Sequence, residues 1–156
     1  NLPADTDSLR TIGLIQYELG KYADAVKSYD EFIKQEPNFP RKGQILYKIG
    51  QACMNLANYD LAIDRLSQIT QESLDNTLQY ADALILLGQA YQNKANEFMQ
   101  SGDEGLYTRF LERAQRTYNR VSITNEPQKI REAITMSAAI DSIIRNRAEL
   151  TPSNAP

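Results

Sequence analysis

The chain of 156 residues contains no histidine and a single cysteine, Cys53. Histidine is the commonest acid–base group near neutral pH and the commonest metal ligand, so its absence argues against the usual catalytic and metal-binding arrangements. One cysteine cannot form an intrachain disulfide or a cysteine-rich metal site. Cys53 also falls at an inward helix position without a histidine to act as its base, so we expect it to pack rather than react. We therefore expect no catalytic residue, no metal site and no cofactor.

Proline, glycine and long apolar runs are also scarce. Six prolines and seven glycines are typical of helices joined by short turns. The longest apolar run, from Ala83 to Leu87, is far shorter than the roughly 18 residues that cross a membrane, so we expect no membrane span. An apolar content of 42% and a charged content of 24% are values of a globular protein, and we expect a single domain.

The chain also lacks a large excess of charge of either sign, since its net charge is −3. The residues up to Gly105 include 9 basic and 15 acidic side chains, and those from Leu106 onward include 8 basic and 5 acidic ones. This asymmetry can bias the encounter with a partner, but it falls short of the basic surface that nucleic acid requires. We expect no nucleic-acid partner.

Four arginines recur on one face of a predicted helix: Arg109, Arg113, Arg116 and Arg120. Two interpretations stay open. The stripe is either a surface for an acidic partner or a solvated outer face on which Glu112 pairs with Arg116 at a spacing of four residues. We favour the solvated face, because such pairs are common on exposed helices.

The most informative feature that the sequence does contain is an internal repeat with a shift of 37 residues. Leu9, Ile12, Gly13, Tyr22, Ala25, Tyr29 and Phe32 return as Leu46, Ile49, Gly50, Tyr59, Ala62, Leu66 and Ile69. A unit this short cannot bury its own apolar face, so neighbouring copies must stack to form a core. The apolar spacing is near 3.6 residues, which predicts that each copy consists of two helices.

Turn and capping signals place these helices. We predict helices over about 6–19, 22–35, 42–57, 59–70, 77–100 and 127–150, with another between the turn at 100–105 and about residue 121. Asp5 or Thr6 caps the first helix, and Gly20 suits the left-handed conformation that ends it. Asn125, Pro127 and Gln128 signal the start of the last helix.

The predicted domain covers residues 1–150, and residues 151–156 form a tail. Its repeats span about 6–39, 43–75 and 77–124, and the last helix, 127–150, caps the stack. We expect Gly13, Gly50 and Gly88 to lie at close helix crossings. On the second helix of each hairpin, we expect Ala25, Ala62 and Ala114 to face these glycines.

The third copy is longer than the first two. Gly88 and Ala114 are 26 residues apart, whereas the equivalent pairs are 12 apart. Gly102 divides the added residues equally, so each arm gains seven residues, or about two helical turns. We expect the last helix to cover the apolar surface of this longer hairpin, with Ile134, Ile140 and Ile144 making the contacts.

The series Leu9-x2-Ile12-Gly13, Ala25-x3-Tyr29 and Pro37 resembles the tetratricopeptide repeat. Two further copies read Leu46-x2-Ile49-Gly50 with Ala62-x3-Leu66, and Leu84-x2-Leu87-Gly88-x2-Tyr91 with Ala114-x3-Tyr118. The resemblance covers about residues 6–121, although leucine replaces the usual tryptophan three times. The repeat length of 37–38 residues resembles that of bacterial extracytoplasmic and envelope-assembly proteins. The cytoplasm and the periplasm or envelope both stay open as locations.

This resemblance implies an all-α fold of antiparallel helix hairpins stacked into a right-handed superhelix, an α-α solenoid, with a C-terminal capping helix. It also implies a non-catalytic scaffold or adaptor that binds a protein or peptide in its concave groove. The alternative is a regulatory receptor for a small peptide or ligand in the same groove. Pro3 lies 10 residues before Gly13, as at a repeat boundary, so we expect further repeats before Asn1.

The groove-facing helices carry mixed side chains, and we expect twelve of them to point into the concavity. They are Asp7, Arg10, Leu14, Tyr17, Gln44, Tyr47, Gln51, Met54, Asp82, Ile85, Gln89 and Gln92. Glutamine amides can bond a peptide backbone, and aromatic rings supply contact area at low entropic cost. An ordinary solvated surface is the competing interpretation of the same residues.

Overall fold

The computed structural model describes residues 5–150. These residues form seven α-helices: α1 (Thr6–Glu18), α2 (Tyr22–Gln35), α3 (Lys42–Asn55), α4 (Tyr59–Ser67), α5 (Thr77–Gln100), α6 (Glu104–Asn119) and α7 (Pro127–Leu150). Two short 3-10 helices, η1 (Gln71–Ser73) and η2 (Arg120–Thr124), follow α4 and α6. No strand occurs within residues 5–150, so the predicted all-α class is confirmed. Pro3 and the tail 151–156 lie outside the described residues.

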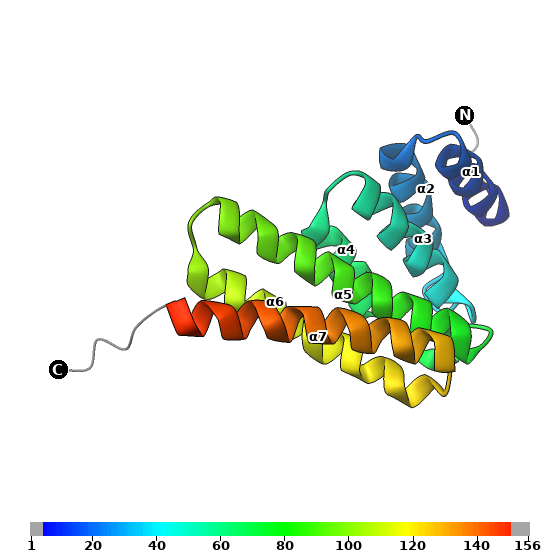
Figure 1. Cartoon of the computed structure of the whole chain (residues 1–156). Helices are drawn as coiled ribbons and strands as arrows, with labels where there is room; N and C mark the ends of the chain where they lie inside the picture. Colours follow the sequence, from blue (N-terminus) through cyan, green and yellow to red (C-terminus); the bar gives the residue numbers. More distant parts are fainter. Residues whose placement is uncertain (1–4, 151–156) are drawn as a thin grey trace.

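The helices pack as consecutive pairs that stack along the chain (Figure 1). α1 packs on α2, α3 on α4 and α5 on α6, and the second helix of each of the first two pairs also contacts the next first helix. α7 lies along the long hairpin of α5 and α6. Each element therefore contacts mainly its neighbours in sequence, which is the architecture of a helical solenoid. Over residues 5–150, no helix combines the length and apolar character needed to cross a membrane.

The turns within the three pairs share one hydrogen-bonding pattern. In the first turn, the Gly20 N–H donates to the Tyr17 carbonyl and the Lys21 N–H donates to the Gln16 carbonyl, which is a Schellman motif. The motif needs a left-handed residue, and Gly20 and Gly102 adopt φ values of 71° and 80° at this position. Ala57 holds the same place in the second turn with a φ of 52°. The repeat thus extends to backbone detail, although one copy uses a residue that this conformation disfavours.

The ends of the last helix differ from the sequence prediction in one respect. α7 begins at Pro127 as expected. Asn125, however, has a left-handed φ of 56° and lies at the C-terminal end of η2, two residues before α7 begins. Asparagine tolerates this conformation better than most residues, so it serves here to reverse the chain.

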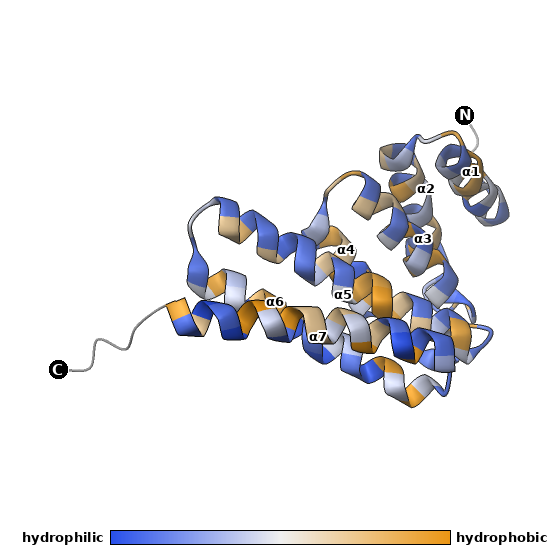
Figure 2. Ribbon diagram, viewed as in Figure 1, coloured by the Kyte–Doolittle hydropathy of each residue, from blue (hydrophilic) through white to orange (hydrophobic). Residues whose placement is uncertain are grey.

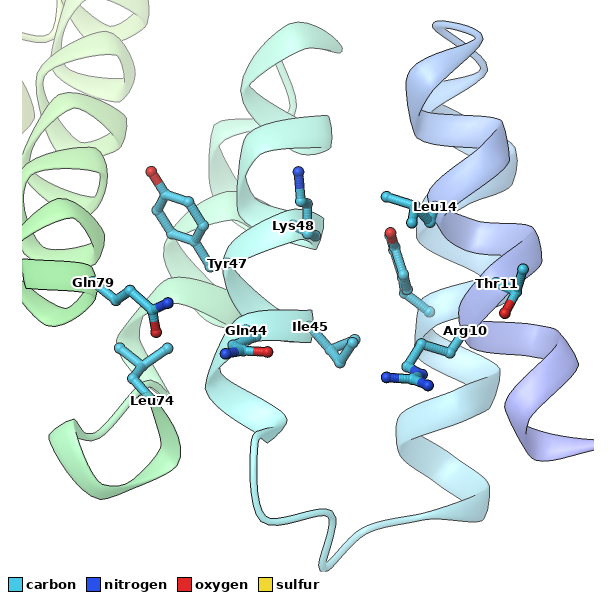
Figure 3. A pocket seen from close by; sticks show the side chains of 10 residues that line it. Arg10, Thr11, Leu14, Gln44, Ile45, Tyr47, Lys48, Leu74 and Gln79 are labelled. Carbon is cyan, nitrogen blue, oxygen red and sulfur yellow. The ribbon is translucent and has the colours of Figure 1, made fainter. Parts of the chain in front are cut away.

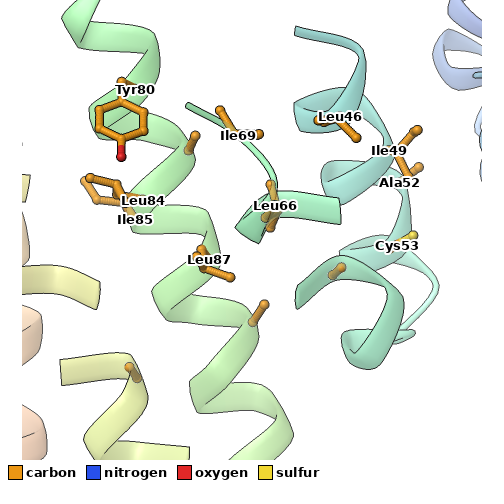
Figure 4. Packing of buried hydrophobic residues seen from close by; sticks show 14 of the residues in the cluster. Leu46, Ile49, Ala52, Cys53, Leu66, Ile69, Tyr80, Leu84, Ile85 and Leu87 are labelled. Carbon is orange, nitrogen blue, oxygen red and sulfur yellow. The ribbon is translucent and has the colours of Figure 1, made fainter. Parts of the chain in front are cut away.

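The core runs between the stacked pairs. Figure 2 shows apolar and polar residues alternating around each helix, as an amphipathic pattern requires. Figure 4 shows Leu66 of α4, and Ile69 just beyond the end of this helix, between the apolar faces of α3 and α5. Ile49 on α3 and Leu87 on α5 are 0% and 3% exposed. Each second helix therefore closes its own pair and also covers the next one.

The three repeat glycines lie beneath bulky side chains. A Cβ on Gly13 would come within 2.8 Å of the Tyr29 ring, and the equivalent positions are occupied by Leu66 over Gly50 and Tyr118 over Gly88. The side chains nearest to the glycines are not those of the predicted alanines. Each opposing residue lies four positions after the alanine, one helical turn further on.

The lengthened third hairpin is confirmed. α5 contains 24 residues, against 13 in α1 and 14 in α3. At the far end of the hairpin, the rings of Phe98 and Phe110 pack with centroids 5.0 Å apart, and the Arg147 guanidinium of α7 lies 4.7 Å from the centre of the Tyr107 ring. α7 therefore follows the longer hairpin out to its tip.

The residues of α7 that make this contact were predicted only in part. Ile140 is completely buried and Ile144 is partly buried against the core, but Ile134 is 61% exposed. The prediction for Ile134 was wrong because six residues correspond to about 600° of helical rotation, which places Ile134 roughly 120° away from Ile140.

Candidate functional site

A cavity of about 530 Å³ opens between α1 and α3 (Figure 3). It is lined by Arg10, Thr11 and Leu14 of α1, Tyr29 of α2, Gln44, Ile45, Tyr47 and Lys48 of α3, and Leu74 and Gln79 beyond α4. Tyr29 and Ile45 are nearly inaccessible and supply apolar surface. The volume is within the usual range for a site that holds a small molecule or a side chain.

The repeat explains why these side chains meet. Arg10 and Tyr47 are 37 residues apart, as are Thr11 and Lys48, so each pair occupies one register position in successive copies. Because the copies stack side by side, α1 and α3 present equivalent faces to the same space. Leu14 remains 45% exposed at this surface and offers an apolar contact to a ligand.

The charged groups in the cavity lining are both cationic: Arg10 on one wall and Lys48 on the other. Lys48 Nζ lies 4.5 Å from the centre of the Tyr17 ring, which holds the ammonium beside the groove. Arg10 Nη2 is 3.9 Å from a carboxylate oxygen of Asp7, whose side chain is almost fully exposed. An exposed pair at this distance is weak, so Arg10 can interact with another anion.

A smaller hollow of about 310 Å³ adjoins the cavity and shares Arg10 and Gln44 with it. It adds Arg41 to the basic side chains, together with Phe39 and Pro40. Asp75 lies next to this hollow, where it accepts a hydrogen bond from Gln44 at 2.5 Å and lies 3.6 Å from Arg41 Nε. The bond to Asp75 fixes the amide orientation of Gln44 at the cavity wall.

Tyr47 marks the side of the cavity that faces α5. Burial raises the pKa of its hydroxyl, and the negative charge of Asp82 raises it further. Asp82 is paired with Lys129 of α7 at 2.8 Å, and this hydrogen bond raises the pKa of Lys129. The Tyr47 hydroxyl therefore stays protonated at neutral pH.

Four of the twelve predicted groove residues line the cavity: Arg10, Leu14, Gln44 and Tyr47. Tyr17 lies beside it, packed edge-on against Tyr22 with ring centres 5.4 Å apart. Gln51 is one turn beyond Tyr47 on α3, and its Oε1 is buried with no hydrogen-bond partner among the described residues. Met54 is partly buried against the core.

The predicted positions on α5 are largely engaged within the protein. Ile85 does not face an open groove, because it is only 5% exposed and α7 packs alongside α5. Gln92 accepts a hydrogen bond from the Tyr118 hydroxyl of α6, and Asp82 is held by Lys129. Gln89 remains partly accessible. The candidate site therefore centres on α1 and α3 rather than on all three first helices.

Sequence reasoning missed several residues of the cavity. Lys48 and Thr11 occupy one repeat position, directly after the predicted Tyr47 and Arg10, so a wider groove face would have included them. Tyr29 and Ile45 were not predicted as cavity residues, because their apolar side chains indicate core packing. Leu74 lies between η1 and α5, and Gln79 lies in the first turn of α5, outside the groove positions that the repeat suggested.

Cys53 is not placed to act as a nucleophile. Cys53 is completely buried, and burial together with the charge of Asp30 raises the pKa of its thiol to about 11. A neutral, inaccessible thiol is a poor nucleophile, as expected for a packing residue. The predicted pair of Glu112 and Arg116 is present at 3.6 Å, and Arg120 donates to the Tyr80 hydroxyl, so part of the arginine stripe has partners within the protein.

Three comparisons with known proteins bear on the first helix pair and on the chain as a whole. The model of the tetratricopeptide repeat matches residues 7–38, which cover nearly all of α1 and α2. Among solved structures, the crystal structure of MamA is similar over 95% of this chain and 83% of that chain, with 20% identity and a TM-score of 0.45. The comparison with curated proteins finds no similar sequence. Residues 7–38 thus match the tetratricopeptide repeat, and the following helices continue the same stacking of helix pairs.

Proposed function

We propose that the chain binds a segment of another protein in the groove between α1 and α3. The segment places an apolar side chain in the cavity and an acidic group between Arg10 and Lys48. The observation that carries this proposal is an apolar floor with one cation on each wall and no carboxylate in the lining. Such an arrangement selects a ligand that combines apolar surface with negative charge.

Polar side chains around the cavity suit a peptide backbone. Gln44 and Gln79 present amides at its edge, and the buried Oε1 of Gln51 has an unmet capacity to accept a hydrogen bond. Tyr17 and Tyr47 flank the same surface and supply rigid contact area. Together these groups offer apolar contact, backbone hydrogen bonds and charge selection.

An array of fluorescent peptides that vary in apolar and acidic residues tests the proposal. We expect acidic peptides with an apolar residue to bind, and Arg10→Glu with Lys48→Glu to weaken binding at least about tenfold, since close charge pairs are often worth more than 1.4 kcal/mol. Arg109→Glu with Arg113→Glu on α6 is the matched control and should leave binding unchanged. Equal loss in both double variants would indicate a nonspecific charge effect and would exclude this groove.

The alternative function is a receptor for a small peptide or ligand. The observation that favours it is the cavity volume of about 530 Å³, which can enclose a small molecule. The size of the bound molecule separates the two functions. A partner whose affinity survives Tyr47→Ala with Gln51→Ala would show that the groove is not the binding surface for either.

A further inference from the structure

The smaller hollow beside the cavity has a pair of cations of its own. Arg10 and Arg41 both line this space of about 310 Å³, and none of the described residues in its lining is a carboxylate. The two side chains are 50% and 64% exposed, so a ligand can reach them. In Figure 3, Arg10 and Gln44 lie nearer than Lys48 to the connection between α2 and α3, which contains Arg41. The hollow is therefore a second basic region at one end of the groove.

The start of α3 adds to the positive potential of this hollow. Arg41 directly precedes α3, at the position where a short polar or acidic side chain usually caps a helix. Its side chain makes no capping hydrogen bond, and the first turn of α3 contains no acidic residue. The positive end of the helix dipole thus reinforces the charges of Arg10 and Arg41. Both features favour an anionic occupant.

A carboxylate of the chain itself shows which kind of anion these groups accept. Asp75, between η1 and α5, lies 3.6 Å from Arg41 Nε and accepts a hydrogen bond of 2.5 Å from Gln44 Nε2. The side chain of Asp75 is 44% exposed, so its pair with Arg41 is in contact with solvent and is weak. A carboxylate of a ligand can therefore compete with Asp75 for the Arg41 guanidinium.

From these contacts, we infer that the hollow binds a second carboxylate side chain of the segment that occupies the groove, and that Asp75 competes with it for Arg41. Arg10 lines both spaces, and its guanidinium has five N–H donors, so it can contact both ligand carboxylates. This inference rests on the proposed groove function and makes it more specific. The preferred partner segment carries two acidic residues, one for the cavity and one for the hollow.

Paired fluorescein-labelled peptides measure what the hollow contributes. The first peptide is a dodecamer of glycine and serine that carries one leucine and one glutamate, at the spacing that binds best in the peptide array. A second series adds another glutamate at each remaining position in turn. Fluorescence anisotropy with the full chain gives each Kd, and the gain is the Kd with one glutamate divided by the Kd with two. We expect a gain of about threefold or more, confined to a few positions.

Three protein variants assign this gain to the hollow. Arg41→Gln should reduce the gain to near one, because it removes the cation that only the hollow contains. Asp75→Asn should increase the gain, because it removes the competing carboxylate. Lys27→Gln, which removes an exposed positive charge on α2, is the matched control and should leave the gain as in the wild type. A purely structural role of Arg41 and Asp75 would not shift the gain in opposite directions.

The outcomes separate this inference from the proposed function. Suppose that the peptide with one glutamate binds and that Lys48→Gln weakens this binding. The inference alone is then overturned if the second glutamate adds no gain, adds the same gain at every position, or keeps its gain in Arg41→Gln. A gain that does not rise in Asp75→Asn would overturn the competition by Asp75. If no peptide binds, or if Lys48→Gln does not weaken the peptide with one glutamate, the proposed function fails together with the inference.

Discussion

The ring of Tyr29 lies so close to the backbone of Gly13 that a Cβ atom on the glycine would be 2.8 Å from ring carbon Cδ1. The relationship recurs in the third repeat between Tyr118 and Gly88. Tyr118 is 1% exposed, and its hydroxyl donates to Gln92, so its ring has little freedom to move aside. The glycines are therefore required by packing against the partner helix.

Gly88→Ala should destabilise the protein by about 1–3 kcal/mol, because the added methyl group overpacks the contact with Tyr118. Gly105→Ala is the matched control, since a Cβ there would meet only a carboxylate oxygen of Asp103 at 3.6 Å. We expect this control to be neutral or to stabilise α6 by about 0.5–1 kcal/mol. Urea unfolding measures both changes, and equal midpoints for the two variants would contradict the packing role of Gly88.

Ala57→Gly should stabilise the protein by about 0.5–1 kcal/mol. Ala57 adopts a φ of 52° in a turn where the other two repeats use glycine, and a left-handed conformation strains an alanine. The same substitution at Ala139, an exposed position within α7, should instead cost about 1 kcal/mol because glycine weakens a helix interior. Opposite shifts of the two urea midpoints are the expected result, and a loss of stability at both positions would disprove the strain.

The free energy of unfolding should fall as the pH rises above about 9. Burial raises the pKa of Cys53 from 9.0 to about 11 and that of Tyr29 from 10.0 to about 12. The folded state thus holds these protons more tightly than the unfolded state. Their contribution is fully present below the unfolded pKa values and is lost as the pH rises through the folded ones.

Urea titrations between pH 8 and pH 11 check this dependence. Cys53→Ala should make the decline shallower because one linked proton is removed. In the native wild type, Cys53 should also react with a thiol reagent only on the timescale of unfolding. Rapid labelling of the folded protein at pH 8 would show that the thiol is accessible.

Ile140→Ala should cost about 2–5 kcal/mol, because it opens a cavity beneath α7 at a completely buried residue. Ile134→Ala removes the same atoms from a side chain that is 61% exposed, so its effect should stay within about 0.5 kcal/mol.

Deleting residues 127–156 should expose the long hairpin and abolish cooperative unfolding. A truncated chain that is monomeric and as stable as the parent would show that α7 is not needed as a cap.

Periodicity predicted the helices well because the apolar face of each helix must match its neighbours. The shift of 37 residues and the positions of Gly20 and Gly102 were enough to place the hairpins. The direction of individual side chains was harder to predict. Ile134 and Ile140 are apolar residues of the same helix, but they lie roughly 120° apart around it, so they do not face the hairpin together.

The site was predictable only where it follows the repeat. Arg10 and Tyr47 share a register position, so the sequence could place both on the groove side of their helices. Ile85 shares that position too, yet it is buried because α7 extends along α5, and the sequence carries no local signal of that contact. Leu74, which precedes α5, and Gln79, in the first turn of α5, reach the cavity from outside the predicted groove positions.

α1 is at once a wall of the cavity and the least buried helix of the stack. Its backbone amides should therefore exchange with solvent earlier than those of α3 or α5. A ligand in the groove would hold α1 in place against α3, so its binding should slow this exchange. Amide exchange of α1 would then report on the occupancy of the groove.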